Sequence, residues 1–82
     1  MSKNDRVRTT VIEVIASQLE VETERVTDGA SFVDDLGADS LALVEATMAI
    51  EEAFEIEIPE EDLEKLRTVG DVIAYVRAHA KE

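Results

Sequence analysis

Apolar residues recur at helical spacing in three separate stretches of this sequence. In the N-terminal part the apolar positions fall three and four residues apart: Val7, Val11, Val14, Ile15 and Leu19. They predict an amphipathic helix from about Asn4 to about Leu19. A second helix is predicted from Asp39 or Ser40, either of which can cap free backbone N–H groups, to about Phe54.

Two more helices are predicted after a short break. Pro59 suits the first turn of a short helix that reaches about Leu66, because the proline ring fixes a helical φ. Thr68 and Asp71 resemble a capping box, which opens a last helix through about His79. The intervening residues 55–58 alternate briefly like a strand, but a lone strand would have no partner in this chain.

The segment between the first two helices, residues 20–39, mixes turn-forming residues with isolated apolar ones. We interpret it as a long ordered loop held on the core by Val21, Val26, Phe32 and Leu36. The pattern therefore predicts an all-α fold: a four-helix bundle with three longer helices, one short third helix and a long loop between the first two. At 82 residues the chain is expected to form a single domain, 1–82.

The second helix carries apolar residues on two faces. One set clusters within about 100° of the helical wheel and suffices as a core face: Leu43, Ala46, Thr47, Ile50 and Phe54. Leu41, Glu45, Met48 and Glu52 gather on the opposite side, flanked by Val44 and Glu51. Because unpaired carboxylates resist burial, this second side is expected to face solvent.

We name the second side the acidic ridge and define it as Leu41, Val44, Glu45, Met48 and Glu52. Carboxylates that steer a basic partner, beside aliphatic groups that supply contact area, are typical of a docking surface. The alternative is that these apolar residues are exposed by chance or belong to the core. The wheel favours docking but leaves both interpretations open.

Charge and composition limit the classes of partner that the protein can bind. The formal net charge is −12, and between Arg25 and Lys65 there are 13 acidic residues and no basic one. Such a field repels nucleic acid and anionic membranes, and it attracts basic protein surfaces. The alternative is a well-solvated surface without a specific partner, so the charge excludes partners better than it identifies one. No apolar run approaches the roughly 20 residues that span a bilayer. With no cysteine and no signal-peptide pattern, a cytoplasmic protein is expected.

The residues offer little for catalysis or metal binding. A nucleophilic serine needs a base, yet the single histidine, His79, lies at the end of the last predicted helix, and no GxSxG motif surrounds Ser40. The segment that starts at Asp28 lacks the ligand spacing of a calcium loop. We therefore expect no catalytic residue and no metal site. Ser40 remains open to two interpretations: a plain helix cap, or a hydroxyl that another enzyme modifies.

The motif "DDLGADSL", followed by "VEATMAIEEAFEIEIPEEDLEKLRTVGDVIAYV", resembles the acyl carrier proteins of type II fatty acid and polyketide synthesis. The likeness runs from about Val7 to about His79. It implies that Ser40 carries 4′-phosphopantetheine through a phosphodiester, and that acyl groups are held as thioesters on the arm's thiol. The cofactor would then bring the sulfur that a chain without cysteine lacks.

The resemblance also implies partners and contact residues. The partners are a phosphopantetheinyl transferase, acyltransferases, ketoacyl synthases and other enzymes with basic docking surfaces, acting on a monomer. The partner-binding residues are Asp39, Leu41, Val44, Glu45, Met48 and Glu52. The acyl chain would lie against Phe32, Leu43, Ala46, Ile50 and Ile58. An ordinary tightly packed core is the alternative for this last group.

Three positions depart from the commonest pattern of the family. Ala42 replaces an acidic or polar residue, Ala46 a larger aliphatic one, and Thr47 a branched aliphatic one. These departures favour keeping two alternatives beside a carrier for fatty acid synthesis. One is a specialised carrier for polyketide, lipid A or another secondary acyl pathway. The other is an unmodified acidic helical adaptor.

Overall fold

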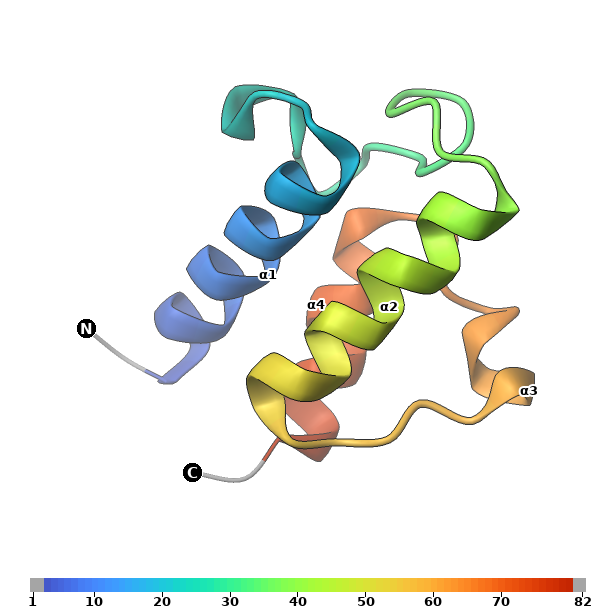
Figure 1. The fold of residues 1–82 in the computed structure, drawn as a ribbon. Helices are drawn as coiled ribbons and strands as arrows, with labels where there is room; N and C mark the ends of the chain where they lie inside the picture. Colours follow the sequence, from blue (N-terminus) through green and yellow to red (C-terminus); the bar gives the residue numbers. More distant parts are fainter. Residues whose placement is uncertain (1–2, 81–82) are drawn as a thin grey trace.

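The computed structural model describes residues 3–80 of the chain and contains the four predicted helices (Figure 1). They are α1 (Lys3–Leu19), α2 (Ser40–Phe54), α3 (Glu60–Leu63) and α4 (Val69–His79). A 3₁₀ turn, η1 (Thr23–Arg25), lies within the long loop between α1 and α2. The predicted all-α class, with three longer helices and one short one, is confirmed. None of the helices within residues 3–80 is both long and apolar enough to cross a bilayer.

The third helix is shorter than predicted. Pro59 is its N-cap rather than a residue of its first turn, and the helix ends at Leu63 instead of continuing to about Leu66. After Leu63 the chain tightens, because the N–H of Lys65 bonds the carbonyl of Asp62 and the N–H of Leu66 bonds that of Leu63. These three-residue steps turn the buried side chain of Leu66 into the core.

Helix α1 packs against both α2 and α4 (Figure 1). Its predicted apolar positions Val7, Val11 and Ile15 are buried, and Val14 and Leu19 pack at the edge of the same cluster. Val69, Val72, Ile73 and Val76 provide the buried face of α4. The core is thus built mainly from aliphatic side chains of the helices and the long loop, and it includes the buried ring of Phe32.

The capping box at the start of α4 is present as predicted. The side chain of Thr68 accepts a hydrogen bond from the N–H of Asp71, and the Asp71 carboxylate accepts one from the N–H of Thr68, at 3.2 and 3.1 Å. The N–H of Arg67 donates to the same carboxylate. The bond from the Thr68 N–H, and next the bond from the Arg67 N–H, lower the pKa of Asp71 below its ordinary value.

The long loop is held by backbone hydrogen bonds as well as by its apolar side chains. Val26, Phe32 and Leu36 are buried and Val21 is half-buried, which confirms their predicted role as anchors. The loop also pairs with Arg67 and with the first turn of α4 through three N–H to carbonyl bonds: Phe32 to Arg67, Val69 to Ala30, and Gly70 to Asp28. A side chain at Gly70 would bring its Cβ within 2.9 Å of the Asp28 carbonyl oxygen, so this approach requires glycine.

The short helix α3 is joined to α4 by a side-chain hydrogen bond. The hydroxyl of Tyr75 donates to Oδ2 of Asp62 at 2.9 Å. Two causes raise the pKa of Tyr75 above its ordinary value: chiefly the desolvation of the half-buried phenol, and also this bond to a carboxylate. The bond holds α3 beside the core at neutral pH, where the phenol keeps its proton.

Candidate functional site

Ser40 is the first residue of α2, and Asp39 is the residue that caps the helix. The Asp39 backbone is extended, and its Oδ1 accepts a hydrogen bond from the N–H of Ala42 at 2.8 Å. Of the two capping residues that the sequence left open, Asp39 is therefore the cap. The Ser40 side chain is exposed, and within residues 3–80 no hydrogen bond is formed by its hydroxyl.

The loop that leads to Ser40 is locally fixed. Gly37 has a φ of +68°, a left-handed conformation that glycine adopts without a steric penalty. The next residue, Ala38, is buried, and its N–H donates to the carbonyl of Phe32 at 2.8 Å. The chain thus leaves the core at Ala38 and enters α2 two residues later, which sets Ser40 at a defined place on the surface.

The surroundings of Ser40 fit an attached phosphodiester. Its hydroxyl is accessible to another enzyme, and it lies at the positive end of a 15-residue helix, where free N–H groups and the helix dipole favour an anion. Since Asp39 supplies the cap, modification of Ser40 would remove no hydrogen bond from the helix end. The residues present therefore fit 4′-phosphopantetheine on Ser40.

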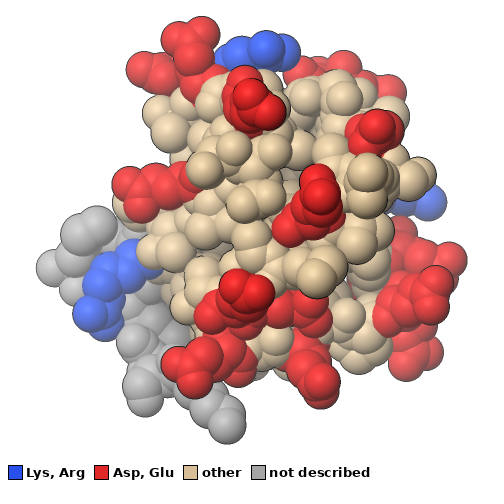
Figure 2. Space-filling model, viewed as in Figure 1, with Lys and Arg blue, Asp and Glu red and all other residues tan. Residues whose placement is uncertain are grey.

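The acidic ridge lies on the solvent side of α2, as the wheel predicted. The exposed fractions of its three large apolar side chains are 67 % for Leu41, 43 % for Val44 and 55 % for Met48. Glu45 and Glu52 are exposed beside them, and Asp39 is exposed at the helix start. Figure 2 shows acidic residues spread over this face of the molecule, with the surface of uncharged residues between them.

Part of the acidic ridge borders a shallow hollow on the surface. Glu45, Met48 and Glu52 line it together with Ala49 of α2 and Gln18 of α1. The structure therefore brings three of the six predicted partner-binding residues to one concave patch, whereas Asp39, Leu41 and Val44 lie outside it. Gln18 was missed, because a wheel drawn for one helix says nothing of the neighbouring helix. Ala49 is on α2 itself, and the wheel did not single it out.

Glu51, which the wheel placed beside the ridge, points elsewhere. It is half-buried, and its Oε2 accepts a hydrogen bond from the N–H of Ile58 at 2.8 Å. This carboxylate holds the segment between α2 and α3 in place. It therefore supports the fold and is not part of the exposed acidic face.

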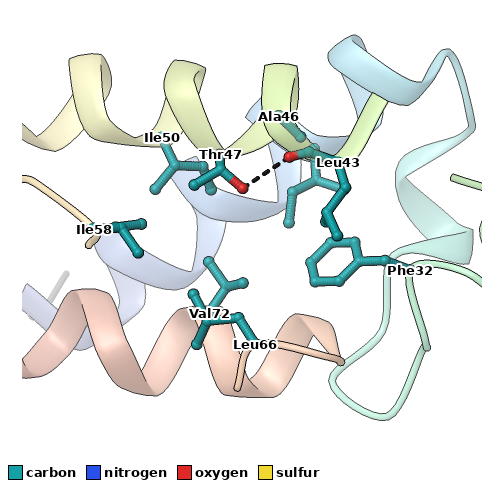
Figure 3. A pocket seen from close by; sticks show the side chains of 9 residues that line it. Phe32, Leu43, Ala46, Thr47, Ile50, Ile58, Leu66 and Val72 are labelled. Carbon is teal, nitrogen blue, oxygen red and sulfur yellow. Dashed lines mark hydrogen bonds between the residues drawn. The ribbon is translucent and has the colours of Figure 1, made fainter. Parts of the chain in front are cut away.

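A small cavity lies inside the bundle beneath α2 (Figure 3). All five residues predicted to contact an acyl chain line it: Phe32, Leu43, Ala46, Ile50 and Ile58. Four further residues complete its wall: Ile15, Thr47, Leu66 and Val72. Its volume of about 10 Å³ is close to that of a single water-sized sphere. The cavity is thus too small for an acyl chain, and its wall must move before a chain can enter.

An open groove of about 520 Å³ lies next to this cavity, between the long loop and α3. Phe32, Leu43 and Leu66 line both spaces and therefore form the partition between them. Leu43 is one turn from Ser40 on α2, so the groove begins close to the predicted attachment residue.

The four additional wall residues differ in how far the sequence could reveal them. Thr47 was placed on the core face by the wheel, and Ile15 and Val72 had helical spacing that marked them as buried. That these side chains meet around one cavity depends on how α1, α2 and α4 cross, which their spacing does not give. Leu66 was missed as a wall residue, because it was placed in the third helix. In the structure it follows the helix, in a tight turn that buries its side chain.

His79 has a local role at the end of α4. Its side chain is exposed, its Nδ1 lies 2.9 Å from the carbonyl oxygen of Tyr75, and its ring stacks on the Tyr75 ring with centroids 4.0 Å apart. Within residues 3–80, no group of three potential metal-ligating side chains is gathered.

A small helical bundle with an accessible serine at the start of its second helix fits the class of phosphopantetheine-dependent carriers, and so does the acidic, partly apolar face along that helix. Comparison with known proteins agrees. Residues 9–76 match the family model described as "Phosphopantetheine attachment site". The acyl carrier protein of Clostridium acetobutylicum is 50 % identical to this chain over 72 residues, which cover 88 % of this chain and 94 % of that protein.

The chain therefore belongs to the acyl carrier protein family, and it is a non-catalytic carrier of acyl groups on a phosphopantetheine arm. A carrier of this class acts with a phosphopantetheinyl transferase and with enzymes of fatty acid synthesis.

Proposed function

We propose that Ser40 is the attachment residue and that the chain delivers acyl thioesters to enzymes of fatty acid synthesis. The observation that carries this proposal is that Asp39, and not Ser40, caps the start of α2. The Ser40 hydroxyl is therefore exposed and has no role in holding the helix end. If the chain were an unmodified acidic adaptor, Ser40 would serve as a helix cap. Because Asp39 is the cap, that interpretation no longer accounts for Ser40.

When attached, 4′-phosphopantetheine supplies the thiol on which an acyl group is held as a thioester. The protein's own residues do the rest. As the Ser40 oxygen bonds to phosphorus and gives up its proton, the pyrophosphate bond of coenzyme A breaks and adenosine 3′,5′-bisphosphate leaves. The start of α2 would stabilise the negative charge of the phosphodiester. Asp39 keeps the helix end formed while this happens, because its bond to the N–H of Ala42 does not involve Ser40.

The acidic ridge, with Asp39, is proposed as the docking surface for the partner enzymes. Its carboxylates steer a basic surface into place, and Leu41, Val44 and Met48 supply apolar contact. Their exposure beside Ser40 on one helix supports this role, since a partner that covers the ridge also reaches the attachment site. Acyltransferases, ketoacyl synthases and the transferase are the partners that we infer, with the chain acting as a monomer in the cytoplasm.

The cavity beneath α2 is proposed as the place where an acyl chain is sheltered. Its wall is almost entirely apolar, and a movement of Phe32, Leu43 or Leu66 would join it to the open groove. Ala46 lines this cavity, and a larger side chain at that position would fill its small volume. A specialised acyl pathway remains the second candidate, because Ala46 and Thr47 change the size and polarity of this wall.

Intact mass measurement tests the attachment. The protein, a phosphopantetheinyl transferase and coenzyme A are incubated, and the wild type is expected to gain one phosphopantetheine. Ser40→Ala should gain nothing, whereas the control Ser17→Ala, which removes another exposed serine, should be modified like the wild type. An unmodified wild type, or a modified Ser40→Ala variant, would overturn the proposal.

A further inference from the structure

One polar side chain interrupts the apolar wall of the cavity beneath α2. Of the nine residues that line it, eight are aliphatic or aromatic, and the ninth is Thr47. Figure 3 shows Thr47 on α2, between the end of the cavity at Phe32 and the end at Ile58. A polar atom in such a place calls for an explanation, because an apolar residue of the same shape, valine, would pack equally well.

The Thr47 hydroxyl is bonded but not saturated. Its Oγ1 donates to the carbonyl oxygen of Leu43 at 2.8 Å, which uses the single hydroxyl proton. The two lone pairs of a hydroxyl oxygen remain able to accept. The cavity is therefore lined by a hydrogen-bond acceptor that needs no rearrangement of the protein to receive a donor.

Thr47 also lies on the edge of α2 that carries Ser40. The two residues are seven apart, which is about two turns, so they lie on nearly the same side of the helix. Leu43, one turn closer to Ser40, borders both the groove and the cavity. A chain that enters past Leu43 therefore meets Thr47 after roughly 6 Å along the helix axis, only a few carbon–carbon bonds from the entrance.

We propose that Thr47 makes this carrier selective for acyl chains that bear a hydroxyl group near the thioester end. This inference rests on the proposed role of Ser40 and of the cavity. The cargo hydroxyl donates to Oγ1 of Thr47 while Thr47 keeps its own bond to Leu43. A cargo oxo group has no proton to donate, so Thr47 would have to give up the Leu43 bond to serve it. An unsubstituted chain offers Oγ1 no such second partner.

The test compares chains of equal length that differ only in the hydroxyl group. Octanoyl, 3-hydroxyoctanoyl and 3-oxooctanoyl groups are attached to Ser40 by the transferase, from coenzyme A analogues whose amide linkage resists hydrolysis. Intact mass first shows that loading is complete. A failure at that step would count against Ser40 as the attachment residue and not against the role of Thr47.

The measured quantity is the equilibrium constant of folding for each loaded form, from urea unfolding. Wild type is compared with Thr47→Val, which keeps the shape but not the oxygen, and with Thr47→Ser, which keeps the oxygen. The hydroxyl group also makes the acyl chain less apolar, and this alters the folding equilibrium in both proteins alike. Subtracting the change measured in the variant from the change measured in the wild type removes that contribution.

We expect the hydroxylated chain, relative to the octanoyl chain, to favour the folded state roughly two- to tenfold more in wild type than in Thr47→Val. Thr47→Ser should restore the effect, and the oxo chain should show less of it. An equal effect of the hydroxyl in wild type and Thr47→Val overturns the proposal.

The wild type alone gives a second measurement, which holds even if a variant fails to fold. The amide NMR signals of Leu43 and Thr47 should differ between the octanoyl and hydroxyoctanoyl forms. Identical signals in both forms would equally overturn the proposal.

Discussion

The backbone N–H of Ile58 donates a hydrogen bond of 2.8 Å to the side-chain carboxylate of Glu51. The bond ties the last turns of α2 to the segment that leads into α3. Ile58 is buried and lines the cavity beneath α2, so this single carboxylate fixes one part of the cavity wall. Glu51, which the helical wheel grouped with the exposed carboxylates, thus stabilises the fold.

Replacing Glu51 should therefore cost more stability than replacing its neighbour Glu52. Glu51→Ala leaves the Ile58 N–H without its charged acceptor, and we expect a loss of about 1–2 kcal/mol in the free energy of unfolding. Glu52→Ala removes the same charge from an exposed side chain and should change that free energy by less than about 0.5 kcal/mol. Urea unfolding measures both variants. Equal losses would show that the bond to Ile58 contributes nothing.

The cap at the start of α2 gives a second prediction about neighbouring residues. Asp39→Ala removes the acceptor of the Ala42 N–H and should destabilise the protein by about 1 kcal/mol. Ser40→Ala removes an exposed hydroxyl that serves no cap, so its cost should stay below about 0.5 kcal/mol. Thermal and urea unfolding of the unmodified proteins measure the difference. If Ser40→Ala proved the more damaging change, Ser40 would have a structural role that this geometry does not give it.

Asp71 makes part of the stability depend on pH. Its folded-state pKa is lowered by hydrogen bonds from the N–H groups of Thr68 and Arg67, so the stability it contributes is fully present above the ordinary aspartate pKa of about 3.9. That contribution is lost as the pH falls through the lower pKa of the folded state. Asp71→Asn should therefore be less stable than wild type by about 1 kcal/mol at pH 7 and approach it below about pH 4.

The same charge change at an exposed loop position controls for the overall repulsion of this acidic chain. Asp34→Asn lies away from the capping box, and it should not show the deficit at pH 7 that disappears in acid. The free energies of unfolding of both variants are measured from pH 7 to pH 3. A constant gap between Asp71→Asn and wild type across that range would contradict the assignment.

Much of the helical framework followed from local signals in the sequence. The capping box needs only Thr68 and Asp71 three residues apart, and the core face of α2 needs only the helical period. The structure accordingly buries Ala46 and Ile50 of that face. Helix ends were less predictable: α3 ends at Leu63, where tight turns replace the helical bonds that its composition would also have allowed.

Contacts between distant segments could not be predicted in the same way. The pairing of residues 28–32 with residues 67–70 joins backbone groups, and backbone groups leave no pattern in side-chain chemistry. The role of Glu51 depends on where Ile58 lies after a turn whose shape the wheel does not describe. For the same reason the cavity residues could be named by their resemblance to a family, but not located by spacing alone.

The acidic ridge leads to a prediction about docking. Glu45→Lys reverses one steering charge, and Met48→Glu places a charge in the apolar contact; each should lower kcat/KM for loading by the transferase roughly five- to thirtyfold. Both side chains are exposed, so the free energy of unfolding should change by less than about 0.5 kcal/mol. Glu13→Lys makes the same charge reversal on α1, outside the ridge, and should leave loading nearly unchanged. Loading rates that fall equally in Glu45→Lys and Glu13→Lys would mean that net charge alone, and not the ridge, guides the transferase.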